Sequence, residues 1–408
     1  MSPLIPVTTL PINRERALLD LLPEGEPLSW VRNGEGLVGW GIYARRTVRG
    51  VDRFRIAREW WRQQCETFAI SDPINSTGTG PILFASFSFD PEEESHLIIP
   101  SVVVGARGAK SWLTWIGEQE APILQASATE LISPQYSWQD GTLPATQWQE
   151  QVAVALTAIQ GGEAEKIVLA RDLIATADGA IDARLILQNL AQEYPKTWSF
   201  SVAGLVGATP ELLLRLNRGM VTSRVLAGTI IKTGDDEKDL TLAASLARSS
   251  KDLEEHSYAV KSVADVLATF CPSTNVPDSP FVLHLANVMH LATDVTGAID
   301  NTSDRIDAFA ILEKLHPSAA VCGTPTDIAA RIIGELEGMS RGRYAGPIGW
   351  IDAEGDGEIG IALRCGEISG EQIRLFAGCG IVSESNPAKE LAESQAKFLP
   401  MINALQKN

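Results

Sequence analysis

Residues 345–383 constrain the fold more than any other part of this sequence. The stretch holds three apolar runs, AGPIGWID, EIGIALRCGEI and QIRLFAGCGIV, and the short turn AEGDG joins the first two. Short turns between strand-like runs predict antiparallel neighbours, because parallel strands require long crossover connections. Paired runs of the same kind occur at residues 80–106 and 210–230. The chain is therefore expected to build large antiparallel sheets.

Helical segments separate these groups of strands. Apolar spacing and capping signals predict helices at residues 48–68, 146–163, 182–193, 236–270 and 387–405. Ser249 and Asp252 fit a capping box that starts a second helix within the fourth segment. Residues 133–150 are polar and rich in turn residues, which is typical of a linker. Meanders with helices between them, without a regular strand–helix–strand alternation, indicate the α+β class.

Charge and composition exclude several kinds of partner. The 408 residues carry a formal net charge of −17, which opposes binding to nucleic acid or to an anionic membrane over most of the surface. An anionic ligand would therefore need a locally positive pocket. The sequence contains no GxxxxGK loop for nucleotide phosphates and no HExxH zinc motif. Neither a nucleotide site nor covalent catalysis by serine or cysteine is expected.

Cysteine usage and the N-terminus predict a soluble cytoplasmic protein. The cysteines are odd in number and scattered, without CxxC spacing, at Cys65, Cys271, Cys322, Cys365 and Cys379. Such a pattern favours reduced thiols over a disulfide framework or a zinc site. The first residues lack the basic and apolar regions of a signal peptide, and no apolar run is long enough to span a bilayer.

Two predicted helices carry acidic pairs that would suit a hard cation. Glu390, Glu393 and Lys397 follow at i, i+3 and i+7, and Asp252 and Glu255 follow at i, i+3, so each set shares one helix face. A solvated helix face is the alternative interpretation. If the two helices meet, their carboxylates would bind Mg²⁺, which takes one or two protein carboxylates and completes its shell with ligand oxygens.

Four single residues in apolar surroundings are further candidates. Lys166 opens the strand-like run KIVLAR and shares a face with Val168. Arg364 lies within an apolar strand, so a carboxylate partner from the protein or from a substrate is expected. Glu211 is either a residue at the surface end of a strand or a buried acid with a raised pKa. His290 precedes a strand-like run, where a structural role is the ordinary one.

Taken together and in order, ten segments resemble the chorismate-utilising enzymes. The segments are KIVLAR, GATPELLL, LAGT, KDLEEH, HLATDVTG, LHPSAAVCGTP, GRYAGPIGWID, IALRCGEI, LFAGCGIV and ELAESQAKF. This family includes isochorismate synthase, salicylate synthase, anthranilate synthase component I and aminodeoxychorismate synthase component I. The resemblance covers roughly residues 80–405. It implies one large α+β domain over residues 1–408, with two antiparallel sheets packed face to face and helices outside; residues 1–145 give the N-terminal part of the sheets and residues 146–408 carry the active site.

The resemblance implies a role for each candidate. Glu255, Glu390 and Glu393 match the acids at the family's Mg²⁺ site, and Glu211 matches the general acid. Positions that match the chorismate-contacting residues are Ala227, Gly228, Thr229, His290, Ala320, Tyr344, Arg364, Gly378 and Lys397.

The nucleophile distinguishes the branches of the family, and two positions indicate water. Enzymes that deliver ammonia carry glutamine where this chain has Lys166, and those with a lysine nucleophile carry PIKGT where this chain has VLAGT with Ala227. Lys166 would deprotonate a water that attacks C2 of chorismate. Glu211 would protonate the departing C4 hydroxyl, and Mg²⁺ would offset the ring carboxylate. The resemblance is greatest to isochorismate synthases and implies the product isochorismate, with no redox or nucleotide cofactor.

Two alternatives stay open at this stage. Salicylate synthase shares the lysine and eliminates pyruvate from isochorismate, but it usually has phenylalanine where this chain has His316. The other alternative is a metal- or metabolite-binding protein without activity, which should have lost Lys166, Glu211 or a metal glutamate. A monomer without a glutaminase subunit is expected, because water needs no ammonia donor. The product would feed menaquinone, siderophore or salicylate biosynthesis.

Overall fold

The computed structural model describes residues 3–124, 131–299 and 306–407. The helices in these ranges are α1 (Arg53–Cys65), α2 (Ala145–Gln160), α3 (Ala183–Glu193), α4 (Asp236–Leu246), α5 (Ser250–Leu267), α6 (Ala308–Leu315), α7 (Thr326–Leu336) and α8 (Pro387–Gln406), with a short 3₁₀ helix at Leu18–Leu21. None of these helices has the length and apolar character that crossing a membrane requires.

The strands alternate with these helices in groups. The first eight are β1 (Ile5–Pro11), β2 (Leu28–Arg32), β3 (Glu35–Val48), β4 (Phe68–Ser71), β5 (Ile82–Ser86), β6 (Ser95–Arg107), β7 (Lys110–Ile116) and β8 (Tyr136–Asp140). The next eight are β9 (Lys166–Ala177), β10 (Trp198–Val202), β11 (Leu205–Thr209), β12 (Leu212–Asn217), β13 (Met220–Ile231), β14 (Ser273–Asn275), β15 (Phe281–His284) and β16 (Val288–Ala298). The last five are β17 (Gly323–Thr324), β18 (Pro347–Asp352), β19 (Gly357–Ile361), β20 (Cys365–Ser369) and β21 (Gln372–Ile381).

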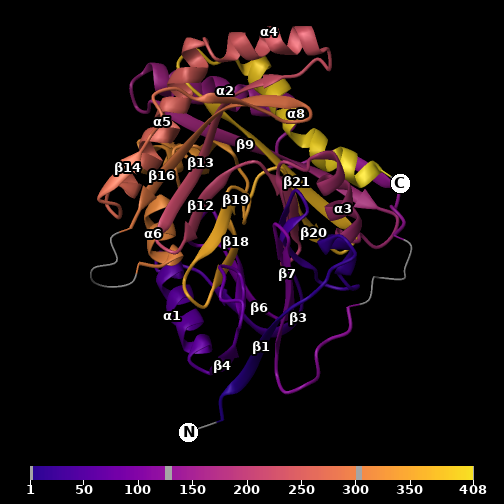
Figure 1. The fold of residues 1–408 in the computed structure, drawn as a ribbon. Coiled ribbons are helices and arrows are strands. Elements are labelled where there is room, and N and C mark those ends of the chain that lie inside the picture. The colour runs from indigo at the N-terminus through magenta and orange to yellow at the C-terminus, as the bar shows by residue number, and fades with distance from the viewer. Residues whose placement is uncertain (1–2, 125–130, 300–305, 408) are drawn as a thin grey trace.

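The strands form two layers that are joined along one side. Hydrogen-bonded neighbours run from β16 through β13, β12, β19, β18, β5, β6, β3, β2, β10, β11, β20 and β21 to β9, and these pairs are antiparallel. Figure 1 shows β12, β13, β18 and β19 on one side and β20 and β21 on the other, with α5 and α8 near the upper ends. The predicted α+β class with antiparallel sheets is confirmed, and β3 and β6 connect its two layers.

The predicted helices are confirmed, but one predicted strand and the predicted linker are wrong. The run EIGIALRCGEI is two strands, β19 and β20, because Arg364 between them has a left-handed backbone with φ of 48°. Residues 198–209 form the hairpin of β10 and β11. The stretch 133–150 is no linker, since it contains β8, which pairs with β9, and the first turns of α2.

Short matches to catalytic motifs fall in turns. Residues 34–39 and 355–360 fit the pattern GxGxxG, which in dinucleotide-binding proteins joins a strand to a helix. Here the first match runs from the β2–β3 turn into β3, and the second from the β18–β19 turn into β19. Residues 338–342 fit GxSxG, but they follow helix α7, and the Ser340 hydroxyl accepts a hydrogen bond from the Gly342 amide at 2.9 Å. None of the three has the strand-to-helix setting that its motif requires.

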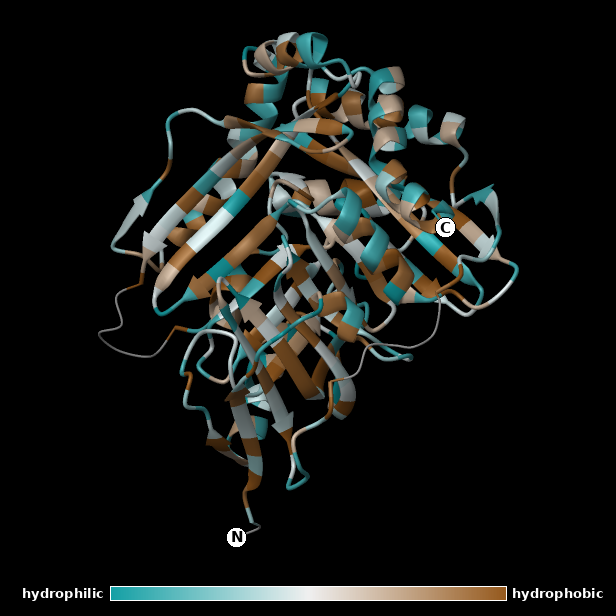
Figure 2. Cartoon of the chain, turned by 45° about the vertical axis from the view of Figure 1, so that its right-hand side comes forward, coloured by the Kyte–Doolittle hydropathy of each residue, from teal (hydrophilic) through white to brown (hydrophobic). Residues whose placement is uncertain are grey.

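Apolar residues of both layers meet in one large core. Phe84 and Trp350 from neighbouring strands, Leu169 from β9 and Val263 from α5 are each at most 2% exposed and belong to the same cluster. Figure 2 shows hydrophobic residues along the strands at the centre of the molecule. The core therefore fixes β9 and α5, the elements that carry Lys166 and Glu255.

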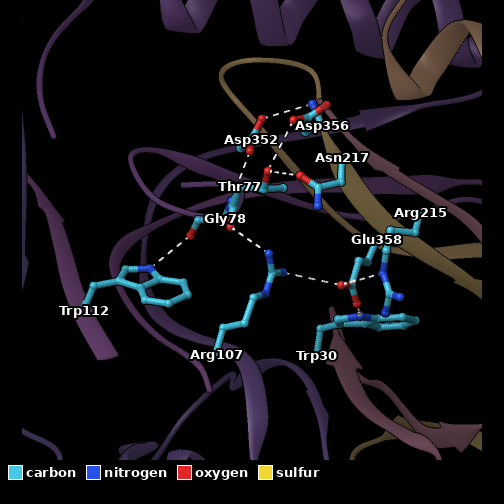
Figure 3. A network of polar contacts seen from close by, with 10 residues as sticks. All are labelled: Trp30, Thr77, Gly78, Arg107, Trp112, Arg215, Asn217, Asp352, Asp356 and Glu358. Atoms are coloured by element: carbon cyan, nitrogen blue, oxygen red, sulfur yellow. Dashed lines mark hydrogen bonds and ion pairs between the residues drawn. The ribbon is translucent and has the colours of Figure 1, made fainter. Parts of the chain in front are cut away.

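A partly buried carboxylate links four strands of the two layers (Figure 3). Glu358 of β19 accepts hydrogen bonds from Trp30 Nε1 at 3.0 Å, Arg215 Nε at 3.0 Å and Arg107 Nη2 at 3.5 Å. These donors come from β2, β12 and β6. Because one carboxylate serves three donors, its charge is expected to contribute to the stability of the joint.

Replacing Glu358 by glutamine is expected to lower the free energy of unfolding by about 1–2 kcal/mol, because both arginines are partly exposed and water compensates some of the loss. Urea denaturation measures the difference. Glu335→Gln is the matched control, since Glu335 pairs with Arg331 on the exposed face of α7, where ion pairs contribute little. Equal effects of the two substitutions would contradict a special role for Glu358.

Candidate active site

A small cavity lies at the end of the layers that carries α5 and α8. Its volume is about 60 Å³. All nine residues predicted to contact chorismate line this cavity, and so do Glu211 and Glu255. Residues far apart in the sequence are thus brought to one place by β9, β13, β16, β21, α5 and α8.

Lys166 is fully buried and lies at the edge of this cavity. Its side chain has no exposed surface, its Nζ lies 3.4 Å from Glu255 Oε1, and no hydrogen-bond partner for the amine exists among the described residues. Lys166 does not itself line the cavity, but its neighbours Glu255 and Gly380 do. The face that Lys166 shares with Val168 is therefore turned towards the site.

Gly380 makes room for the side chains of Lys166 and Glu255. A Cβ atom at Gly380 would lie 2.1 Å from Glu255 Oε1, closer than real Cβ contacts come, and 3.0 Å from Lys166 Cε, which is unusually tight. The sequence interpretation assigned no role to Gly380, because the requirement arises from contacts across β21, β9 and α5. A residue larger than glycine here would displace Glu255 or Lys166.

Glu211 stands where β11 passes into β12, and its surface alternative is wrong. Its exposed fraction is 4%. Burial raises the pKa of Glu211 to about 8, although Lys166, Lys397 and Arg364 each act to lower it. The carboxyl is therefore protonated at neutral pH and holds a proton that it can donate.

The cationic guanidinium of Arg364 is hydrogen-bonded to the neutral ring of His290 at the cavity wall. Arg364 Nη2 donates a hydrogen bond to His290 Nε2 at 3.1 Å, which leaves the ring proton on Nδ1 for Thr229 Oγ1, also at 3.1 Å. Burial, with Arg364 and Lys397 nearby, lowers the pKa of His290 well below its ordinary value. Among the described residues no carboxylate forms an ion pair with Arg364, so the expected protein partner is absent there and the guanidinium suits an anionic ligand.

A β-bulge aligns α5 with the site. The register of β13 against β16 shifts between Ala227 and Thr229, where Gly228 has φ of 75°. A Cβ atom at Gly228 would lie 3.0 Å from Asp252 Cβ, so the first turn of α5 packs closely on the bulge. The predicted cap is present, because the Asp252 amide donates to Ser249 Oγ at 3.3 Å.

Three glutamates from α5 and α8 gather beside the cavity. Glu255 and Glu390 are 9% and 1% exposed, so a solvated helix face is wrong as an interpretation. Ligand atoms of Glu390, Glu393 and Cys379 lie within 4.8 Å of one another. Buried carboxylate oxygens from two helices are the donors that Mg²⁺ and similar hard cations prefer. Glu390 and Glu393 could together hold a divalent cation, and Glu255 is a further candidate ligand on the cavity wall.

Each of these glutamates also has a lysine partner. Besides the contact of Lys166 with Glu255, Lys251 Nζ lies 2.7 Å from Glu390 Oε1 and Lys397 Nζ lies 2.5 Å from Glu393 Oε1. Burial opposes ionisation of Glu393, but Lys397 outweighs it and lowers the pKa of this carboxyl. Burial and the Glu393 charge raise the pKa of Glu390. Each of the three acids therefore has a basic side chain in contact, within a strongly acidic protein.

Two further positions differ from what the sequence suggested. Arg341 was not predicted, yet it lines the cavity. It ties β9 to the loop before β17 by donating hydrogen bonds to the Val168 and Val321 carbonyls at 2.7 and 2.8 Å. His316, the residue by which the sequence resemblance favoured isochorismate synthases over salicylate synthases, does not line the cavity. It packs at the rings of Phe54 and Phe89, and burial lowers its pKa to about 3.

Comparisons of the sequence and of the structure find similar proteins that bind chorismate or are named isochorismate synthases. A family model described as "Chorismate binding enzyme" matches residues 24–406. Isochorismate synthase MenF of Bacillus subtilis (strain 168) is 33% identical over 403 residues, which cover 90% of this chain and 85% of the relative. Isochorismate synthase DhbC of the same organism is 33% identical over 352 residues, covering 83% and 84%. The structure of MenF, the menaquinone-specific isochorismate synthase from Escherichia coli, gives a TM-score of 0.82 at 25% identity and covers 99% of this chain and 95% of that chain.

Proposed function

Because the chain belongs to the family of chorismate-binding enzymes, we propose that it is an isochorismate synthase, an isomerase that converts chorismate to isochorismate. The observation that carries the proposal is the placement of a buried lysine and a protonated glutamate around one cavity. Lys166 adjoins Glu255 at 3.4 Å, and Glu211 lines the same cavity as Glu255. These are the two groups that the exchange of one hydroxyl for another requires.

The two residues divide the proton transfers. Lys166 in its neutral amine form accepts a proton from water as the water oxygen bonds to C2 of chorismate, and the ring double bonds shift towards C4. Glu211 gives its proton to the C4 hydroxyl, whose bond to carbon breaks, so one water enters and one leaves. The burial that raises the pKa of Glu211 to about 8 supports this assignment, since a general acid must be protonated at the working pH.

The cationic residues that line the cavity would bind the carboxylates of the substrate. Arg364, Lys397 and the neutral ring of His290 line the cavity, and charge-assisted hydrogen bonds to carboxylates are strong where water is excluded. Glu255, Glu390 and Glu393 would hold Mg²⁺, which when bound would offset the charge of the ring carboxylate. The net charge of −17 is thereby overcome locally.

The bulge of β13 supports water as the nucleophile, because its residues Ala227 and Gly228 carry no amine. Ala227 and Gly228 line the cavity where lysine-nucleophile enzymes carry PIKGT. The proposed reaction leaves the downstream pathway open. This chain is 33% identical both to a MenF and to a DhbC, so identity assigns its product to neither menaquinone nor siderophore biosynthesis.

The purified protein with Mg²⁺ is expected to convert chorismate to isochorismate, with EDTA abolishing turnover and added Mg²⁺ restoring it. Liquid chromatography of the reaction mixture identifies the product. Salicylate and pyruvate as main products would instead identify a salicylate synthase. Absence of any turnover with Mg²⁺ present would contradict the enzyme assignment, and full turnover after EDTA treatment would contradict the role of the metal.

A further inference from the structure

Lys251 is a half-buried cation to which neither the family resemblance nor the proposed reaction gives a role. It lies in the first turn of α5, four residues before Glu255, and so shares a helix face with that glutamate. Its Nζ contacts Glu390 Oε1 at 2.7 Å, and the exposed fractions of the two side chains are 24% and 1%. Among the described residues, Glu390 is the one partner that the structure gives to this ammonium.

The other two lysines of the cluster have additional contacts or roles. Lys397 lines the cavity and donates to the Gly378 carbonyl at 2.9 Å, and Lys166 is the proposed base. Lys251 neither lines the cavity nor contacts another polar group among the described residues. Its remaining effect on the site is its charge, which acts on Glu255 and Glu393 as well as on Glu390.

We propose that Lys251 is a built-in counter-cation of the glutamate cluster, one that balances Glu390 when no divalent cation is bound and weakens the binding of that cation. The inference rests on the proposed Mg²⁺ dependence. Without Lys251, Glu390 would be a buried carboxylate next to Glu393 with no cation beside it, which is costly. With Lys251, an entering dication meets an ammonium that opposes it. Lys251 thus stabilises the folded protein when the site holds no metal, and it lowers the affinity of the site for the metal.

The first test measures Mg²⁺ affinity by isothermal titration calorimetry without chorismate. Lys251→Met keeps the length of the side chain and removes its charge, and is expected to tighten Mg²⁺ binding by about 10-fold or more. Lys261→Met is the matched control, because Lys261 belongs to the same helix and pairs with Asp265 at the surface. The control should bind Mg²⁺ as the unchanged protein does. Equal or weaker affinity in Lys251→Met would overturn the proposal.

A second measurement separates charge from packing. Metal-free Lys251→Met is expected to melt at a lower temperature than the unchanged protein, and the double variant Lys251→Met/Glu390→Gln is expected to recover most of the loss. A loss that the double variant does not recover would mean that Lys251 acts by packing, which overturns the proposal. If Lys251→Met does not fold without metal, Glu390→Gln and the double variant are compared instead, and the double variant should bind Mg²⁺ more tightly.

The two proposals fail separately. Unchanged protein that binds Mg²⁺ but forms no isochorismate contradicts the proposed function and leaves the affinity comparison intact. Turnover that depends on Mg²⁺, combined with unaltered affinity in Lys251→Met, contradicts the role of Lys251 alone.

Discussion

Replacing Lys166 by methionine is expected to lower kcat/KM for isochorismate formation by about 10²- to 10⁴-fold, the range for loss of a general base. Methionine fills the space opposite Gly380 but accepts no proton. Binding of chorismate should persist, because Arg364, Lys397 and His290 line the cavity independently of Lys166. Steady-state kinetics, together with the shift of the melting temperature that chorismate causes, separate loss of chemistry from loss of binding.

The same variant is expected to be no less stable than the unchanged protein when Mg²⁺ is present. The Lys166 amine is buried without a hydrogen-bond partner among the described residues, and an unsatisfied buried polar group costs about 1–3 kcal/mol. Such a cost persists where function requires the group. Lys110→Met, at an exposed position on β7, is the control for the effect of losing a surface lysine. Unchanged turnover in Lys166→Met would refute the assignment of the base.

Sequence patterns predicted the elements well but not the points where the chain departs from regular structure. Alternating residues in KIVLAR placed Lys166 on the face of Val168, and the structure keeps both on β9. The apolar run around Arg364 predicted one strand, whereas its left-handed φ of 48° ends β19 and lets β20 pair with β11 instead. The apolar pattern does not predict this break, because the break depends on tertiary pairing: β19 pairs with β12 and β18, whereas β20 pairs with β11.

The spacing of the acidic residues also did not show whether their side chains are buried. The i, i+3 spacing of Glu390 and Glu393 established a shared face, but a solvated face and a metal site have the same spacing. The packing of α8 on β21 and of α5 on the β13 bulge decides between them. For the same reason Gly380 and Lys251 were missed: each acquires its significance from a side chain on another element. The resemblance to a family supplied what spacing alone did not.

Replacing Glu211 by glutamine is expected to lower kcat/KM by about 10²- to 10⁴-fold through loss of the acid. In the unchanged protein, activity should fall as pH rises through about 8, the pKa to which burial raises Glu211, because the ionised carboxylate has no proton to give. A pH–rate profile of kcat/KM shows this descending limb. A profile in which activity keeps rising well above pH 8 would contradict Glu211 as the acid.

Stability provides a test of the same carboxyl that does not depend on turnover. The pKa of Glu211 in the folded protein, about 8, exceeds the ordinary value of about 4.3 in an unfolded chain. Its contribution to stability is therefore complete below about pH 4.3, declines as the unfolded chain ionises, and is lost once pH rises through the folded pKa. Glutamine does not titrate, so Glu211→Gln should gain stability relative to the unchanged protein between about pH 5 and pH 8.

Urea denaturation at these two pH values measures that gain, and Glu92→Gln, at an exposed position, should show none. If Glu211→Gln also shows none, the carboxyl is already ionised in the folded protein at neutral pH, and its proton is not the one that the C4 hydroxyl receives. A gain in stability together with a lost descending limb in the residual activity would instead locate both effects in one buried carboxyl. The burial that costs the protein stability at high pH is then the same burial that keeps the acid protonated for its reaction.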